Sequence, residues 1–349
     1  MKDISEDMPE HGDAFYNIRN KYPNLVDFSA SIAPTNLPSD FKISALEMIH
    51  YPSSQGKIEE IIANRTGLDR KNIVAGYGLT SIIYAVYSMF QRGKAVLSEP
   101  IFSEHRKAAE SSSINVVRLP LKVMQKNPGI IRDYMPDIVS INSPVNPTGE
   151  YLAYDTISII AEKLMAFGIF LFLDEAFVDF VSWNRRIDYV DLIERYPNTI
   201  VGRSMSKISG FAGFRLGYSV SSPEIANRIR RRLIPWTVPK FYTEHMDEIL
   251  NYSPNPEKIG ELREIMINEL KGIGLTILGK PEANFISFTI PGKIKGSDFY
   301  ESMIREGILL RPLENFYGFT SRDFRAAVLD REANEKMVKS AEKVINHYR

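Results

Sequence analysis

The stretch "GIFLFLDEAF", residues 168–177, is a run of apolar residues that ends in two carboxylates before a final Ala-Phe pair. A continuous apolar run of this length is typical of a strand buried on both faces, as in a parallel sheet covered by helices. From about residue 56, strand patterns of this kind alternate with helical ones. Strands are predicted within 94–100, 137–149, 198–207 and 216–222, and helices over 56–67 and 81–93. This alternation predicts an α/β sandwich with right-handed crossovers.

The pattern changes after about residue 245. Residues 255–274 and 332–348 have the apolar spacing of amphipathic helices, and residues 283–290 alternate like a half-buried strand. We therefore predict three parts: an N-terminal arm over 1–30, a large domain over 31–245, and a smaller α+β domain over 246–349.

The composition excludes several function classes. Lys and Arg number 43 and Asp and Glu also number 43, so the net charge of zero gives no reason to expect nucleic acid or an anionic membrane as a partner. The chain has no cysteine, which excludes disulfides and thiolate chemistry. Its five histidines show no metal-ligand spacing. The N-terminus is not a signal peptide and no apolar run approaches the length of a membrane span. We expect a cytoplasmic protein without a metal site.

Chemically active groups follow the predicted strands. Gly76–Thr80, Asn146, Asp174 and Lys207 all come after a strand. In open α/β sheets ligands bind beyond the carboxyl ends of the strands, so we expect these groups to meet in one crevice. A lysine amine forms a Schiff base with an aldehyde, and a buried carboxylate keeps a pyridine nitrogen protonated. Amides at a Gly-rich helix start hold a phosphate, to which Arg215 adds a charge-assisted bond. Pyridoxal 5′-phosphate (PLP) needs all of these groups.

The motifs that carry these groups resemble those of the fold-type I PLP enzymes of the class I and II aminotransferase family. They are "NSPVNPTG" (142–149), "DEAF" (174–177), and S-x-S-K (204–207) followed by "GFRLGY" (213–218). The order of the motifs along the chain and the spacings between Asn146, Asp174, Lys207 and Arg215 agree with the family as well. The resemblance implies PLP as cofactor and an aspartate aminotransferase-like fold, with a mostly parallel seven-stranded sheet between helices. It also implies a homodimer with shared active sites.

The resemblance implies a role for each site residue. Lys207 forms the Schiff base and moves the substrate proton, Asp174 pairs with the pyridine nitrogen, and Asn146 donates to the ring hydroxyl. Phe102 stacks on the ring, and Phe177 stands where many relatives have a tyrosine that also touches that hydroxyl. The phosphate is assigned to Gly78, Leu79, Thr80, Ser204, Ser206, Arg215 and, from the partner subunit, Tyr51. Alternatives remain: Phe102 as ordinary core, Thr80 and Ser204 as helix caps, Asp174 and Glu175 as a salt-bridged pair, and Tyr51 as a residue before a turn proline.

Two reactions remain open within the family. "HGD…VDFSASIAP", "IPWTV" (234–238) and "LLRPLENFYGF" (309–319) resemble segments of threonine-phosphate decarboxylases, which serve cobalamin side-chain biosynthesis, although "HGD", Tyr77 and "SIAPTNLP" depart from the usual strings. Arg311 and Arg325, whose spacing this subgroup shares, are expected to bind a small phosphorylated amino acid or amino alcohol, with Asn146 and His11. The alternative is an aminotransferase of the histidinol-phosphate type that uses 2-oxoglutarate. A PLP-fold transcription regulator is a third class, in which the basic run at 228–232 binds an anionic partner. Because the net charge is zero, we expect this run to be the solvated face of a helix instead.

Overall fold

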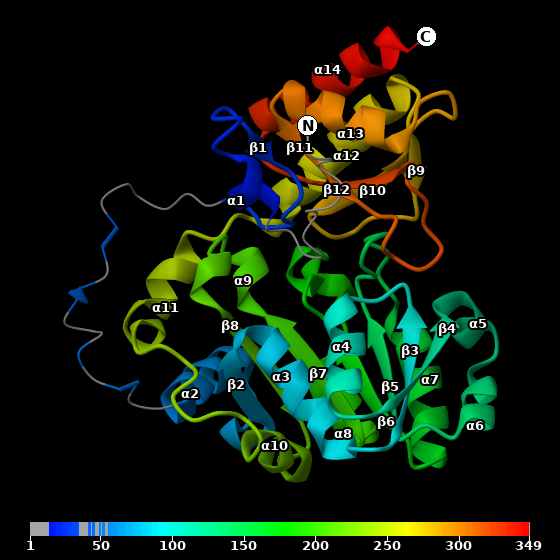
Figure 1. Ribbon diagram of the computed structural model, residues 1–349. Coiled ribbons are helices and arrows are strands. Elements are labelled where there is room, and N and C mark those ends of the chain that lie inside the picture. Colours follow the sequence, from blue (N-terminus) through cyan, green and yellow to red (C-terminus); the bar gives the residue numbers. More distant parts are fainter. Residues whose placement is uncertain are drawn as a thin grey trace.

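The computed structural model describes residues 14–34, 41, 42, 44, 45, 49, 51, 52 and 55–348. His11 and the first 13 residues of the predicted arm lie outside these residues. The described chain forms two lobes, each built on its own sheet (Figure 1). We call residues 55–251 the large lobe, and residues 14–34 with 256–348 the small lobe.

The large lobe is built on a sheet that has seven strands within the described residues, in the order β2-β8-β7-β6-β5-β3-β4. The strands are β2 (Ile73–Tyr77), β3 (Lys94–Glu99), β4 (Asn115–Pro120), β5 (Ile138–Asn142), β6 (Phe170–Asp174), β7 (Thr199–Ser204) and β8 (Leu216–Ser221). The pairs from β4 through β7 are parallel, and β8 runs antiparallel to both of its neighbours. The predicted parallel, doubly covered sheet is confirmed, with β8 as its one reversed strand.

Helices cover both faces of this sheet (Figure 1). One face carries α2 (Gln55–Thr66), α7 (Tyr154–Ala166), α8 (Tyr189–Arg195) and α11 (Phe241–Asn251), and the other carries α3 (Gly78–Tyr87), α4 (Ser103–Ser111) and α10 (Pro223–Arg230). Three shorter helices are α5 (Leu121–Lys126), α6 (Ile131–Tyr134) and α9 (Met205–Ile208). The helix predicted over 81–93 instead begins at Gly78 and ends at Tyr87, where a 3₁₀ turn over Ser88–Phe90 follows.

The small lobe has an antiparallel sheet in the order β12-β13-β10-β9 among the described residues. Its elements are α12 (Pro256–Gly272), β9 (Thr276–Leu278), β10 (Phe285–Thr289), α13 (Gly296–Arg305), β11 (Ile308–Leu309), β12 (Arg311–Pro312), β13 (Asp323–Ala327) and α14 (Arg331–His347). In the register of β12 and β13, Arg311 stands directly opposite Arg325. The two arginines predicted to act together are thus cross-strand neighbours.

The N-terminal residues pack on the small lobe. After α1 (Ala14–Ile18), strand β1 (Val26–Asp27) pairs in parallel with β11. Phe28 is fully buried in the core of the small lobe, together with Leu25 and Ala33. The domain boundaries at residues 30 and 245 stay a prediction, and packing assigns residues 25–33 to the small lobe.

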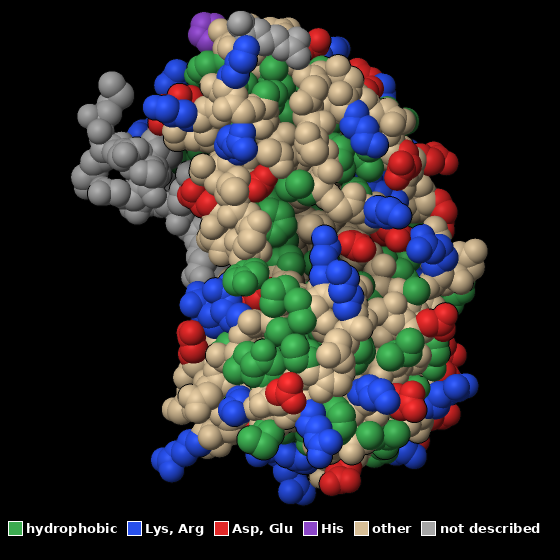
Figure 2. All heavy atoms as spheres, turned by 90° about the vertical axis from the view of Figure 1, so that its right-hand side faces the viewer, with side chains coloured by type: hydrophobic (Ala, Val, Ile, Leu, Met, Phe, Trp, Pro, Cys, Tyr) green, Lys and Arg blue, Asp and Glu red, His purple; other side chains and the backbone are tan. Residues whose placement is uncertain are grey.

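The surface carries both signs of charge. On the face shown in Figure 2, Lys and Arg side chains lie among Asp and Glu side chains. In the basic run, Arg230 bonds Glu59 and the Ile73 carbonyl, and Arg228 lies over the Phe170 ring. These arginines are therefore held by protein groups. Within the described residues, no helix has the length and apolar character needed to cross a membrane.

Candidate active site

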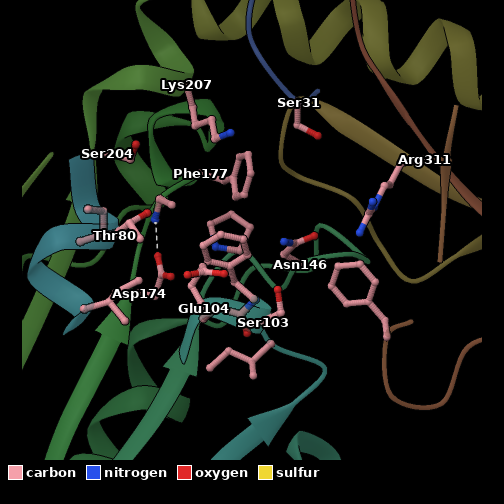
Figure 3. Close-up of a pocket in the computed structure, with 18 of the residues that line it drawn as sticks. Ser31, Thr80, Ser103, Glu104, Asn146, Asp174, Phe177, Ser204, Lys207 and Arg311 are labelled. Carbon is pink, nitrogen blue, oxygen red and sulfur yellow. Dashed lines mark hydrogen bonds between the residues drawn. The ribbon is translucent and has the colours of Figure 1, made fainter. Parts of the chain in front are cut away.

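A cavity of about 590 Å³ lies beyond the carboxyl ends of the large sheet and is lined by both lobes. Its lining includes the predicted residues Leu79, Thr80, Phe102, Asn146, Asp174, Phe177, Ser204, Ser206, Lys207, Arg215, Arg311 and Arg325. Figure 3 shows Lys207, Phe177 and Asp174 in one part of the cavity and Arg311 beyond Asn146. Gly78 and Tyr51 do not line it, and His11 lies outside the described residues. The crevice expected from the strand ends is present.

Lys207 stands on α9, the short helix that follows β7, and its side chain enters the cavity. The pKa of its amine is lowered from the ordinary 10.5 to about 8. Burial is the main cause, and the positive charges of Arg325 and Arg215 add to it, whereas the carboxylate of Asp174 opposes it. The amine also lies 5.7 Å from the centroid of the Phe177 ring. A larger fraction of Lys207 is therefore neutral near physiological pH than of an ordinary lysine, which favours its reaction with an aldehyde.

Asp174 ends β6 and is buried. Its Oδ2 lies 3.0 Å from Nε2 of His105 on α4, and its Oδ1 accepts a bond from the Ala176 amide at 2.9 Å. Because an ionised carboxylate only accepts, Nε2 of His105 is the donor. Nδ1 of His105 then faces the Tyr87 hydroxyl at 3.2 Å, and that hydroxyl lies 2.7 Å from Oγ of Ser140. A buried chain of hydrogen-bonding groups, His105, Tyr87 and Ser140, therefore orients the Asp174 carboxylate.

Glu175 points away from the cavity and forms its own buried ion pair. Its Oε2 accepts from Nη1 of Arg203 at 2.7 Å, and Nη2 of Arg203 reaches Asp179 at 3.2 Å. Arg203 thus fastens two positions of the 174–180 loop that carries Asp174 and Phe177. Each carboxylate has its own partner, because Glu175 pairs with Arg203 and Asp174 contacts His105. The salt-bridge alternative therefore accounts for Glu175, whereas Asp174 also lines the cavity.

The phosphate cradle assigned to α3 and Arg215 has no room for extra side-chain atoms. A Cβ on Gly78 would lie 2.7 Å from Nη2 of Arg215, and a Cβ on Gly217 would lie 2.2 Å from the Leu79 nitrogen. Gly78 has φ +67°, and Arg215 itself has φ +57°, a left-handed conformation that non-glycine residues seldom adopt. Glycines at these positions let the backbone amides at the start of α3 approach the guanidinium of Arg215. Such a nest of donors beside a cation suits a phosphate.

The other predicted cofactor residues differ in their local setting. Ser204 occupies the N-cap position of α9, but its side chain makes no cap hydrogen bond. Thr80 lies inside α3, whose N-cap position is Tyr77. The helix-cap alternative therefore fails for both residues. Phe102 precedes α4, packs partly against the apolar core and also lines the cavity. The core interpretation and the cofactor interpretation are therefore compatible for this residue.

Asn146 and Arg325 join the two lobes. Nη1 of Arg325 donates to Oδ1 of Asn146 at 2.6 Å, and Nη2 donates to the Ser29 carbonyl at 3.1 Å. Arg325 is buried, and its guanidinium lies 4.9 Å from the Phe285 ring centroid. Burial lowers the pKa of Arg325 and neighbouring Arg311 lowers it further, although the group stays protonated at neutral pH. This charge is costly to bury, which marks it as a site for an anion.

The sequence does not predict His105, which supports Asp174 without lining the cavity, or several of the lining residues. The histidine spacing indicates no metal site, and the bond of His105 to Asp174 joins positions far apart in the sequence. The lining also includes Ser29–Ile32 of the N-terminal segment, together with Ser103, Glu104, Arg106 and Arg118. The place of His105 one helical turn after the proposed ring-stacking Phe102 was the available signal. The string "DFSASIAP" (27–34) carries a family resemblance, but it does not indicate that these residues line the site.

Comparisons with known proteins agree with this geometry. The family described as Aminotransferase class I and II matches residues 46–340. The chain belongs to the class I and II aminotransferase family. A putative threonine-phosphate decarboxylase from Caldanaerobacter subterraneus subsp. tengcongensis is 27% identical over 323 residues, covering 85% of this chain and 84% of that protein. The histidinol-phosphate aminotransferase structure from Clostridium acetobutylicum has a TM-score of 0.81 and 26% identity, covering 92% of this chain and 99% of that one.

Pyridoxal 5′-phosphate is the cofactor of this enzyme. The family match supports it, and the same fold is seen in the histidinol-phosphate aminotransferase from Sinorhizobium meliloti, solved with PLP, at a TM-score of 0.78 and 16% identity over 100% of this chain and 98% of that one. The cavity fits the group: it offers an amine of lowered pKa, a buried carboxylate and a glycine-lined phosphate cradle.

Our first prediction concerns the pH dependence of cofactor capture by the apoenzyme. At pH 8 about half of Lys207 is neutral, against about 0.3% of a lysine with the ordinary pKa. The rate of PLP incorporation, followed by visible absorbance, should therefore rise with a midpoint near pH 8. Arg325→Met should move the midpoint upward, because one repelling charge is removed. A midpoint near 10, or a visible band that persists in Lys207→Ala, would contradict this assignment.

A second prediction tests His105. His105→Leu removes a buried hydrogen bond to a carboxylate, a contact worth roughly 1.5–3 kcal/mol. We expect the PLP dissociation constant to rise about 10- to 100-fold, as measured by titrating apoenzyme with PLP. Tyr87→Phe keeps the imidazole and removes only the next hydroxyl, so its effect should be smaller. Thermal unfolding measurements check that both proteins are folded. If the folded His105→Leu variant binds PLP as tightly as the unmodified enzyme, His105 does not support Asp174.

Proposed function

We propose that this protein is a PLP-dependent decarboxylase of a small amino acid with a phosphorylated side chain, of the O-phospho-L-threonine type. The observation that carries the proposal is the pair Arg311 and Arg325, which stand opposite each other on β12 and β13 and both line the cavity of Lys207. Two cations directly opposite each other repel, so this arrangement suits a ligand with two anionic groups. A phosphorylated amino acid has a carboxylate and a phosphate.

Arg325 is the better candidate to hold the carboxylate. Asn146 and the Ser29 carbonyl fix the direction of its guanidinium. The unpaired Nε and the second hydrogen on a terminal nitrogen remain as donors that can bind a carboxylate. A carboxylate held from one direction sets which bond at Cα stands perpendicular to the cofactor ring. Arg311 then takes the phosphate. Fixing the carboxylate and the phosphate together selects the bond that breaks.

The remaining side chains have roles that follow from their positions. When bound, PLP supplies an aldehyde that links to amines and a ring that accepts electrons. Asp174, braced by His105, offers its carboxylate to the ring nitrogen. Lys207, with an amine of lowered pKa, exchanges a proton at the substrate carbon. Asn146 lies where it can donate to the ring hydroxyl, and Phe177 contributes no hydroxyl of its own, so Asn146 makes that contact alone.

The second candidate is an aminotransferase of the histidinol-phosphate type. It is favoured by the similarity to the Clostridium acetobutylicum structure, which covers most of both chains. The same two arginines suit the two carboxylates of 2-oxoglutarate. The discriminating difference is therefore the need for a keto-acid acceptor, which a decarboxylase does not have.

The protein is further proposed to be a homodimer in which the partner subunit's Tyr51 reaches the phosphate cradle. In the single chain, Tyr51 is 76% exposed and its ring lies 4.8 Å from that of Trp236, which is 61% exposed. Ile49 and Ile234 next to them are also exposed. Large apolar side chains grouped on a surface are typical of an interface.

The third prediction tests the reaction. The PLP-loaded enzyme should release carbon dioxide from O-phospho-L-threonine without any keto acid, and Arg325→Met should raise KM for that substrate at least tenfold, because a charge-assisted grip is lost. Carbon dioxide release and substrate loss are the measurements. If no carbon dioxide forms, and histidinol phosphate transfers its amino group to 2-oxoglutarate, the aminotransferase candidate replaces this one.

The fourth prediction tests the dimer. Sedimentation equilibrium should give twice the chain mass, and Trp236→Glu, which places a charge in the exposed aromatic pair, should shift the enzyme toward monomer. Trp183→Glu is the matched control, since Trp183 is 77% exposed and does not belong to that pair. A monomer at micromolar concentration for the unmodified enzyme would rule out the shared site.

A further inference from the structure

Arg118 occupies a part of the cavity wall that neither the motifs nor the two small-lobe arginines account for. It stands on β4, opposite Leu97 of β3, and lines the cavity from the large lobe. Its Nε donates to Oε1 of Glu99 at 2.5 Å. The side chain of Glu99 is 5% exposed, whereas that of Arg118 is 43% exposed. A buried carboxylate therefore fixes one edge of a guanidinium whose remainder reaches solvent.

The opposite edge of this guanidinium is available to a ligand. Within the described residues, Nη1 and Nη2 of Arg118 have no hydrogen-bond acceptor. The flat face is covered by Tyr317 of the small lobe, whose ring centroid lies 4.9 Å from Cζ of Arg118. In Arg325, by contrast, both terminal nitrogens already bond to protein oxygens. Arg118 thus presents two oriented donors, the fork that matches an oxyanion.

The charge of the whole cavity favours an anion at this edge. Six basic side chains line it against three carboxylates, a surplus of three (6 − 3). The basic side chains are Arg106, Arg118, Lys207, Arg215, Arg311 and Arg325, and the carboxylates are Glu99, Glu104 and Asp174. The cofactor phosphate and a substrate carboxylate together carry about three negative charges, which matches this surplus. The cavity therefore favours anionic ligands in general, and the two unpaired nitrogens of Arg118 mark its edge as a place where one anionic group can bind.

We infer that Arg118 is a specificity-determining residue that binds the side-chain phosphate of the substrate from the large lobe, while Arg311 binds it from the small lobe. This inference rests on the phosphorylated substrate of the proposed function, but not on which bond of that substrate breaks. Glu99 sets the direction of the Arg118 fork. Tyr317 couples that fork to the small-lobe segment 313–322, so binding of the phosphate holds the two lobes together.

The fifth prediction follows from this assignment and is tested by binding rather than turnover. The PLP-loaded enzyme is titrated with O-phospho-L-threonine and with L-threonine, and the cofactor absorbance is followed. Arg118→Gln should weaken binding of the phosphate ester at least tenfold and change that of L-threonine less than twofold, because only the ester has the group that Arg118 holds. Arg118→Lys, which keeps the charge but not the fork, should recover part of the loss.

Two controls keep the result interpretable. Arg132→Gln alters an exposed arginine that also lies over an aromatic ring, that of Phe167 at 5.7 Å, and does not line the cavity, so both ligands should bind as before. The double variant Glu99→Gln/Arg118→Gln leaves no unpaired buried carboxylate, and it should show the same selective loss if the single variant folds poorly.

Three outcomes are distinguishable. If Arg118→Gln loses the same affinity for both ligands, Arg118 has only a structural role. If it loses affinity for neither ligand, Arg118 is not part of the site. Selective loss for the ester in an enzyme that releases no carbon dioxide would refute the proposed decarboxylation while supporting the phosphate contact.

Discussion

The buried guanidinium of Arg325 joins three separate parts of the chain. It stands on a small-lobe strand, donates to Asn146 of the large lobe, and donates to the carbonyl of Ser29 in the N-terminal segment. Burying a charge of this kind costs several kcal/mol unless it is compensated, and the Phe285 ring supplies part of that compensation. Its Nε has no partner among the described residues. This one incompletely satisfied cation therefore helps to hold the three parts together.

Phe177 shows how one apolar ring serves both lobes. It packs edge-on against Phe285, with ring centroids 4.9 Å apart, and its face lies beside the amine of Lys207. The same ring therefore contributes to the burial that lowers the pKa of Lys207. A tyrosine at this position would bring a hydroxyl into the site. In this chain the position supplies packing and low polarity, so the proposed contact to the ring hydroxyl falls to Asn146 alone.

Much of the site could be predicted because its residues stand at strand ends. Asp174 and Lys207 follow adjacent parallel strands, and topology alone brings the ends of such strands together. The groups that brace them could not be predicted in this way. His105 meets Asp174 only because α4 packs beside β6, and Arg118 meets Glu99 only because β4 pairs with β3 in one register. Local spacing does not encode these long-range pairings. The sequence predicts the N-terminal segment only as an arm for the same reason, because β1 is very short and its partner is β11.

The charges around Lys207 connect binding to proton transfer. The amine is surrounded by Arg325 and Arg215, both of which lower its pKa, and Asp174 only partly opposes them. An anion bound at either guanidinium screens that repulsion, so it raises the pKa of the amine and makes it a better proton acceptor. If Arg325 binds the substrate carboxylate as proposed, the same residue that recognises the substrate also adjusts the pKa of Lys207, which ties recognition of an anionic ligand to the ability of Lys207 to take up a proton.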